Sequence, residues 1–78
     1  MKYYGVTSSS MVAIGYNQET EVLVAQFNAE TYYRYDGVPP GLVATVMFSP
    51  SLGKAFNTLI KEGNFPYQKI NGEVAAAL

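Results

Sequence analysis

The sequence contains neither cysteine nor histidine, and only 14% of its 78 residues are charged. Without cysteine the chain can form no disulfide and no thiolate metal site. Without histidine it lacks both the most common metal ligand and the most common general base. The carboxylates are scattered among expected turns and do not predict a calcium or magnesium site. We therefore expect no metal and no cofactor.

The motifs of common enzyme classes are also missing. The sequence has no G-x-S-x-G elbow, no phosphate-binding Walker loop and no dinucleotide-binding glycine fingerprint. Glu30 and Asp36 are carboxylates that could transfer protons, but each lies beside an expected turn, where solvated carboxylates are common. These absences predict a protein that binds its target and is not an enzyme.

Positive charge is scarce, with five basic residues against six acidic ones and a net charge of −1. Proteins that coat a long phosphate backbone usually carry a basic stripe. The composition therefore weighs against broad nucleic-acid binding and leaves room for a ligand with one or two phosphates.

Short length and limited hydrophobic runs set further expectations. A chain of this size builds a thin core, and its 49% hydrophobic residues favour burial against a second copy, so we expect a homo-oligomer. No hydrophobic run reaches the roughly 18–20 residues of a membrane span, and no apolar leader follows the first residues. We expect no membrane association and a cytoplasmic location.

Alternating hydrophobic residues predict strands at residues 11–16, 21–28 and 31–36, after a lead-in at 1–9. Helical spacing then predicts a helix over 41–48 and a second helix that begins with Ser49 as N-cap and Pro50 in its first turn. Gly63 is the expected C-cap. The predicted fold class is α+β, a three-stranded antiparallel meander followed by a helical hairpin. Residues 68–70 offer a fourth, C-terminal strand, and residues 71–78 are either frayed or one more helical turn.

The tyrosine-rich segment of the third strand is the most informative one. On a strand Tyr33 and Tyr35 share one face, whereas Tyr32, Arg34 and Asp36 share the other. One interpretation makes Tyr33 and Tyr35 core aromatics with hydroxyls at the rim. The other has these rings stack on a base, with Arg34 adding a cation. In that case Tyr32 and Arg34 are the freer pair to touch a ligand.

The start of the second helix is the other candidate. Ser51 and Lys54 could contribute a hydroxyl and a charge to an anion site, and Gly53 would permit close approach. Asn57 and Lys61 follow Lys54 at helical spacing and so share its face. A capped helix with a solvated polar face explains the same residues without any ligand.

Several short segments resemble the KTSC domain family, which occurs at the C-terminus of some lysyl-tRNA synthetases and alone in bacterial and phage proteins. Its hallmark is a central Tyr-x-Tyr. The resembling segments are Ser8-Ser9, Ile14-Gly15-Tyr16, residues 23–27, Tyr33-Arg34-Tyr35, Gly37-Val38-Pro39, Ser51-x-Gly53, Phe56-Asn57, Ile60-Lys61 and Tyr67. The resemblance implies one domain over residues 1–78, with a core at about 8–70, and RNA binding has been suggested for the family. This chain departs from the pattern in its acidic character.

Three functions remain open. The leading hypothesis is a small-nucleotide-binding protein, with the ligand at or near a subunit interface, such as a phage sponge or sensor that sequesters a cyclic-nucleotide signal. The alternatives are an RNA-binding module and a protein–protein interaction adaptor. The expected ligand-binding residues are Tyr32, Arg34, Tyr35, Ser51, Gly53, Lys54, Asn57, Lys61 and Tyr67.

Overall fold

A computed structural model describes residues 1–78 and shows one five-stranded antiparallel sheet. The order of the strands in the sheet is their order in the chain, which is a meander. The strands are β1 (Tyr3–Gly5), β2 (Ala13–Asn17), β3 (Val22–Gln26), β4 (Tyr32–Tyr35) and β5 (Tyr67–Ile70).

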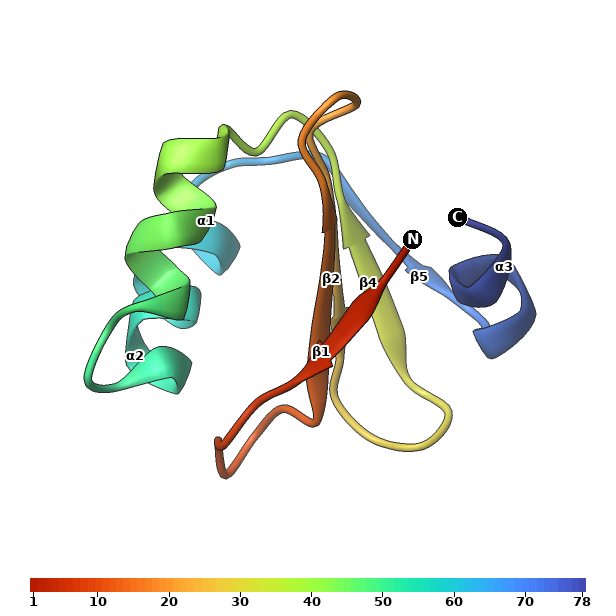
Figure 1. Cartoon of the computed structure of the whole chain (residues 1–78), viewed down its shortest axis with the longest axis horizontal. Helices are drawn as coiled ribbons and strands as arrows, with labels where there is room; N and C mark the ends of the chain where they lie inside the picture. Colours follow the sequence, from red (N-terminus) through yellow and green to blue (C-terminus); the bar gives the residue numbers. More distant parts are fainter.

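The helical segments all follow β4. α1 (Pro40–Met47) and α2 (Leu52–Phe56) come first, and α2 runs without a break into the π-helical turn η1 (Asn57–Lys61). The chain then returns to the sheet as β5, beside β4, and ends in α3 (Gly72–Ala77). α1 and α2 lie on one side of the sheet and α3 lies on the other (Figure 1). None of these helices has the length and apolar character needed to cross a membrane.

The central strand β3 is buried on both faces, which explains why it has no polar side. Leu23 and Ala25 belong to the larger core, whereas Val22 and Val24 belong to the smaller one. Alternate residues of a strand point to opposite faces, so each pair packs under a different layer.

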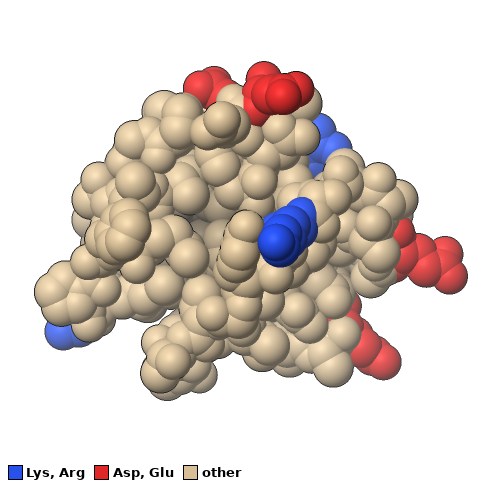
Figure 2. Space-filling model, viewed as in Figure 1, with Lys and Arg blue, Asp and Glu red and all other residues tan.

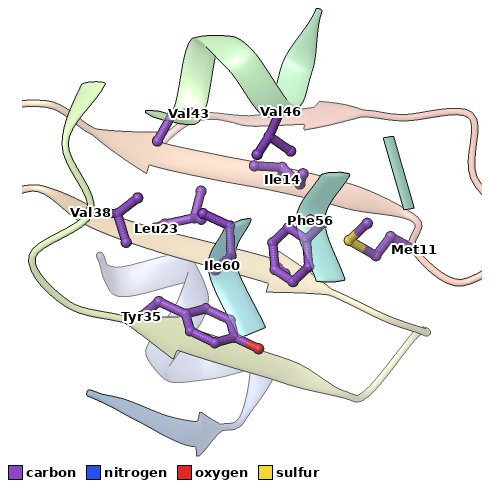
Figure 3. Packing of buried hydrophobic residues seen from close by; sticks show 10 residues of the cluster. Met11, Ile14, Leu23, Tyr35, Val38, Val43, Val46, Phe56 and Ile60 are labelled. Atoms are coloured by element: carbon purple, nitrogen blue, oxygen red, sulfur yellow. The ribbon is translucent and has the colours of Figure 1, made fainter. Parts of the chain in front are cut away.

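The larger core lies between the sheet and the helices α1, α2 and η1. Its side chains interdigitate around Phe56 and Ile60 in the close-up of Figure 3. Each fully buried side chain of this size contributes about 1.5–3 kcal/mol through removal of apolar surface from water. The ten buried residues are Met11, Ile14, Leu23, Ala25, Tyr35, Val38, Val43, Val46, Phe56 and Ile60.

The smaller core closes the opposite face of the sheet. Ala75 of α3 packs there with Val22, Val24 and Ile70. The Tyr3 hydroxyl donates a hydrogen bond of 2.8 Å to the Ala75 carbonyl, which ties β1 to the C-terminal helix. The chain termini consequently lie on the same side of the sheet (Figure 1).

The predicted α+β class, the antiparallel meander and the C-terminal strand are confirmed. Residues 1–9 are not a mere lead-in, since β1 pairs with β2 and places Tyr3 opposite Gly15. The tail resolves into α3, whose N-terminus is capped because the Asn71 side chain accepts a hydrogen bond from the Val74 amide at 2.9 Å.

Two predicted helix boundaries are wrong. The second helix begins at Leu52, with Ser51 as its N-cap. Ser49 and Pro50 instead form a turn before it, because the Ser49 hydroxyl and the Ser51 backbone bond to each other at 3.2 Å. At the other end Glu62 is the C-cap of η1, and Asn64 is the residue with left-handed backbone geometry, at φ 61°.

Candidate ligand-binding site

A hollow of about 540 Å³ opens between the loop before β2 and the helix formed by α2 and η1. We call it the serine hollow. Small-molecule sites usually occupy about 300–1,000 Å³, so its size suits a small ligand. The residues that line it are Thr7, Ser8, Ser9, Ser10, Met11, Phe27, Pro50, Ser51, Leu52, Gly53, Lys54, Phe56, Asn57 and Lys61.

The loop and the helix meet at Gly53. A Cβ atom on Gly53 would lie 3.3 Å from the Ser8 hydroxyl and 3.5 Å from the Ser10 hydroxyl. The two serine hydroxyls are also 3.3 Å from each other. The glycine therefore lets two hydroxyl groups approach the helix backbone, and a hydroxyl can both donate and accept a hydrogen bond.

The charge of the serine hollow is entirely positive. Lys54 and Lys61 line it, and no acidic residue does. Neither lysine belongs to an ion pair, since the chain has only the one between Arg34 and Asp36. The rest of the chain holds three basic residues against six acidic ones. The hollow is thus a local positive region on an acidic protein, which attracts anions.

The surface around α2 agrees with this distribution. In the view of Figure 2 the acidic side chains lie along the upper and right-hand margins of the molecule. The lower left, where α2 is drawn in Figure 1, carries basic atoms and no acidic ones. The face seen in this view therefore presents no carboxylate near α2.

Lys61 occupies a special position within the hollow. Its ammonium lies 4.9 Å from the centre of the Phe27 ring, within the range of a cation–π contact. It ends the π-helical turn η1. Such turns are rare and occur frequently at functional sites. Lys61 also lines a second, smaller hollow, so it stands between the two.

The second hollow, which we call the tyrosine niche, has a volume of about 210 Å³ and is lined by Tyr33, Tyr35, Lys61 and Tyr67. β4 and β5 place Tyr35 directly opposite Tyr67 in the sheet. Burial raises the pKa of the Tyr35 hydroxyl above its usual value near 10.0, and the neighbouring hydroxyls of Tyr33 and Tyr67 raise it further. Tyr35 therefore stays neutral at physiological pH.

The structure brings together most of the predicted site residues. Lys61 is shared by both hollows, while Tyr35 and Tyr67 line the tyrosine niche. The predicted residues that line the serine hollow are Ser51, Gly53, Lys54, Asn57 and Lys61.

Tyr32 and Arg34 lie apart from both hollows. Tyr32 packs against the smaller core on the far face of the sheet, where its ring meets Tyr3 edge-on at 6.3 Å. Arg34 alternates onto that same face and pairs with Asp36 at 2.9 Å. The sheet separates these two side chains from Lys54 and Lys61.

Three parts of the two hollows are not among the residues that the sequence predicts to bind a ligand. These are the loop Thr7–Ser10, Phe27 and Tyr33, and for Tyr33 the sequence leaves a core position and a stacking role both open. Four consecutive hydroxyl residues directly before a strand were the available signal for the loop. No local signal pointed to Phe27, because its position beside Lys61 depends on how the helix packs on the sheet.

Comparison with known proteins identifies relatives of this chain. The model of the KTSC domain matches residues 7–65. The crystal structure of a KTSC domain protein from Yersinia pestis is similar with a TM-score of 0.81 and 35% identity, over 88% of this chain and 96% of that one. An uncharacterised protein of Stutzerimonas stutzeri (strain A1501) is 35% identical over 71 residues, which cover 91% of this chain and all of that protein.

A larger protein also contains a similar segment. A lysine–tRNA ligase of Nostoc punctiforme (strain ATCC 29133 / PCC 73102) is 34% identical over 56 residues, which cover 72% of this chain. The matched segment makes up only 10% of that ligase.

Proposed function

The chain belongs to the KTSC domain family, and we propose that it binds a small nucleotide without transforming it chemically. The observation that carries this proposal is the composition of the serine hollow. Two lysines without ion-pair partners face it together with serine and threonine hydroxyls, and no carboxylate opposes them. Hydrogen bonds from cations and hydroxyls to phosphate oxygens are among the stronger polar contacts in proteins.

The spacing of the two lysines favours more than one phosphate group. Lys54 lies in α2 and Lys61 ends η1, seven positions later on one continuous helix, so nearly two helical turns separate their backbones. One phosphate group is much narrower than that distance. Nucleoside diphosphates and cyclic dinucleotides carry two phosphates and would engage both cations at once.

A protein that holds such a ligand and does not consume it acts as a sensor or as a sponge. The side chains of both hollows include hydroxyls, lysines, an amide and aromatic rings, but neither histidine nor cysteine. These groups bind phosphates and bases well. Stoichiometric capture of a nucleotide signal is the role that this set of side chains supports.

Isothermal titration calorimetry of the purified chain is the test. The panel contains nucleoside mono- and diphosphates, cyclic mononucleotides and cyclic dinucleotides, each measured at low and at moderate salt. We expect at least one member to bind with a stoichiometry of one site per chain or per subunit pair, more weakly at higher salt. Absence of binding heat with every member at low salt would contradict the proposal.

RNA is a second candidate because one relative is a lysine–tRNA ligase. The small number of lysines at the serine hollow limits how many phosphates an RNA could contact there. Filter binding of a transfer RNA at several salt concentrations separates the two candidates. An affinity for RNA that exceeds every small nucleotide and falls steeply with salt would favour RNA.

A further inference from the structure

The tyrosine niche adjoins the serine hollow through two side chains. Lys61 lines both. Phe27 lines the serine hollow and packs edge-on against Tyr33 of the niche, with their ring centres 5.7 Å apart. A ligand with phosphates at Lys61 can therefore place its remaining part against the tyrosines.

The niche combines a fixed ring with an accessible one. Tyr35 is only 4% exposed and packs edge-on against Phe56 of the core, at 5.6 Å between ring centres. Tyr67 is 66% exposed and lies at 5.8 Å and 31° from the Tyr35 ring. The core thus holds one wall in place, while the other presents an aromatic face to solvent. Exposed aromatic faces of this kind stack on planar heterocycles.

The polar groups of the niche do not select one pattern of donors and acceptors. The tyrosine hydroxyls that bond to the protein are those of Tyr3 and Tyr16, so those of Tyr33, Tyr35 and Tyr67 are free to bond to a ligand. The niche has neither a side-chain amide nor a carboxylate. A hydroxyl rotates and serves as donor or acceptor. It can therefore adapt to the edge of any base, whereas an amide or a carboxylate would discriminate.

The lysine in the wall limits the charge of the guest. Rings of tyrosines also recognise quaternary ammonium groups. Here Lys61 lines the same niche, and its positive charge would repel a second cation bound there. These side chains suit a neutral planar ring attached to an anionic group.

We propose that the niche takes the base of a nucleotide whose phosphates lie in the serine hollow, and that it accepts purines and pyrimidines alike. This inference rests on the proposed function. The ligands are then nucleotides that the protein selects by their phosphates, whichever base they carry. Tyr67 is the residue that stacks on the base, and Lys61 contacts the phosphate nearest to it.

The experiment measures the affinities of ADP, GDP, CDP and UDP for the full chain, together with adenosine and ribose 5-phosphate. We expect the four dissociation constants to agree within about tenfold, since stacking tolerates every base. Adenosine, which lacks phosphate, should bind much more weakly than ADP.

Variants locate the base. Tyr67→Ala should weaken all four diphosphates by a similar factor of about 5- to 150-fold, as expected for loss of one stacked aromatic ring. Tyr67→Phe should retain binding, and ribose 5-phosphate should bind the wild type and Tyr67→Ala equally. Tyr4→Ala is the matched control, because Tyr4 is an exposed tyrosine on β1, at the opposite edge of the sheet.

The outcomes distinguish the two proposals. A preference of more than about tenfold for one base, or unchanged affinities in Tyr67→Ala, would overturn the base-tolerant niche and leave nucleotide binding in place. If neither the diphosphates nor ribose 5-phosphate bind, the proposal for the niche fails, and if the cyclic nucleotides of the calorimetry panel give no heat either, the proposed function fails as well.

Discussion

The ammonium of Lys61 lies 4.9 Å from the centre of the Phe27 ring. The Phe27 ring packs in turn edge-on against Phe56, at 6.0 Å between ring centres. An exposed cation is thus connected to the core through one aromatic contact. A contact of this kind already restricts the lysine side chain before a ligand binds. The side chain then loses less conformational entropy on binding, which favours affinity.

Removal of this cation should weaken nucleotide binding specifically. We expect Lys61→Ala to raise the dissociation constant of a nucleoside diphosphate by about 10-fold or more, the effect of losing a hydrogen bond to a charged group. Lys69→Ala is the control, since Lys69 is an exposed lysine on β5 that lines neither hollow. Calorimetry on both variants makes the comparison, and equal losses would show that only net charge matters.

Because Tyr35 stays neutral in the folded protein, the free energy of unfolding should depend on pH in the alkaline range. Its pKa is raised in the folded protein, first by burial and then by Tyr33 and Tyr67. Above a pH of about 10 the unfolded chain releases the proton while the folded chain retains it, so the free energy of unfolding falls as pH rises. In Tyr35→Phe this fall should be shallower. Urea unfolding at a series of pH values from about 8 to 11 measures it.

Tyr16→Phe is the comparison for that series. Burial raises the pKa of Tyr16 as well, with Glu21 adding to it. Its hydroxyl, however, donates a hydrogen bond to the Val38 carbonyl. Tyr16→Phe should therefore lose about 1 kcal/mol already at neutral pH. Tyr35→Phe, which loses no hydrogen bond to the protein, should lose less there. A pH profile of Tyr35→Phe that parallels the wild type would contradict the assignment.

Gly15 should tolerate no side chain, because the Tyr3 ring covers it. A Cβ atom at Gly15 would lie 2.7 Å from Cε2 of Tyr3 and 2.8 Å from the Met1 sulfur. Gly15→Ala should displace β1 and lower the free energy of unfolding by about 1–3 kcal/mol. A Cβ at Gly5, in contrast, meets no atom within 4 Å. Thermal unfolding of Gly15→Ala and Gly5→Ala tests this, and equal melting temperatures would refute it.

Substitution of two phenylalanines should change the stability by very different amounts. Phe56 is 1% exposed and central to the larger core, so Phe56→Ala should cost about 3–5 kcal/mol. Phe48 is 87% exposed, so Phe48→Ser should change the stability of the single chain by less than about 0.5 kcal/mol. Chemical denaturation of each variant measures these differences.

The expected self-association can be tested on the same variant. Phe48 is the most exposed of the large hydrophobic side chains, and such residues gain most from burial against a second copy. We expect Phe48→Ser to lower the fraction of oligomer in sedimentation experiments on the full chain. An oligomer that persists unchanged would place the contact on another surface.

Patterns in short stretches of the sequence predicted three of the strands and the faces on which their side chains lie. Alternation located β2, β3 and β4 because successive residues of a strand point to opposite faces of the sheet. The same alternation separated Tyr33 and Tyr35 from Tyr32, and the two cores confirm that division. The sequence did not predict β1, because a strand of three residues has too few positions to show a period of two.

In the candidate site, patterns in short stretches of the sequence predicted the residues of one helix face but not the contacts between distant segments. Helical spacing alone aligned Lys54, Asn57 and Lys61, and all three line the serine hollow. No spacing could show that Thr7–Ser10 closes its other side, or that Lys61 meets Phe27, since these contacts join residues far apart in the chain.

The sequence by itself determined which side-chain types this protein lacks, how its strands alternate and which residues share the polar face of its helix. These properties depend on residue type and on backbone periods of two and 3.6, which any short stretch of chain carries. Only the tertiary structure decided that Tyr32 and Arg34 lie behind the sheet while Lys61 stands between two hollows. The reason is that packing of the helix on the sheet, driven by burial of Phe56 and Ile60, sets which distant side chains become neighbours.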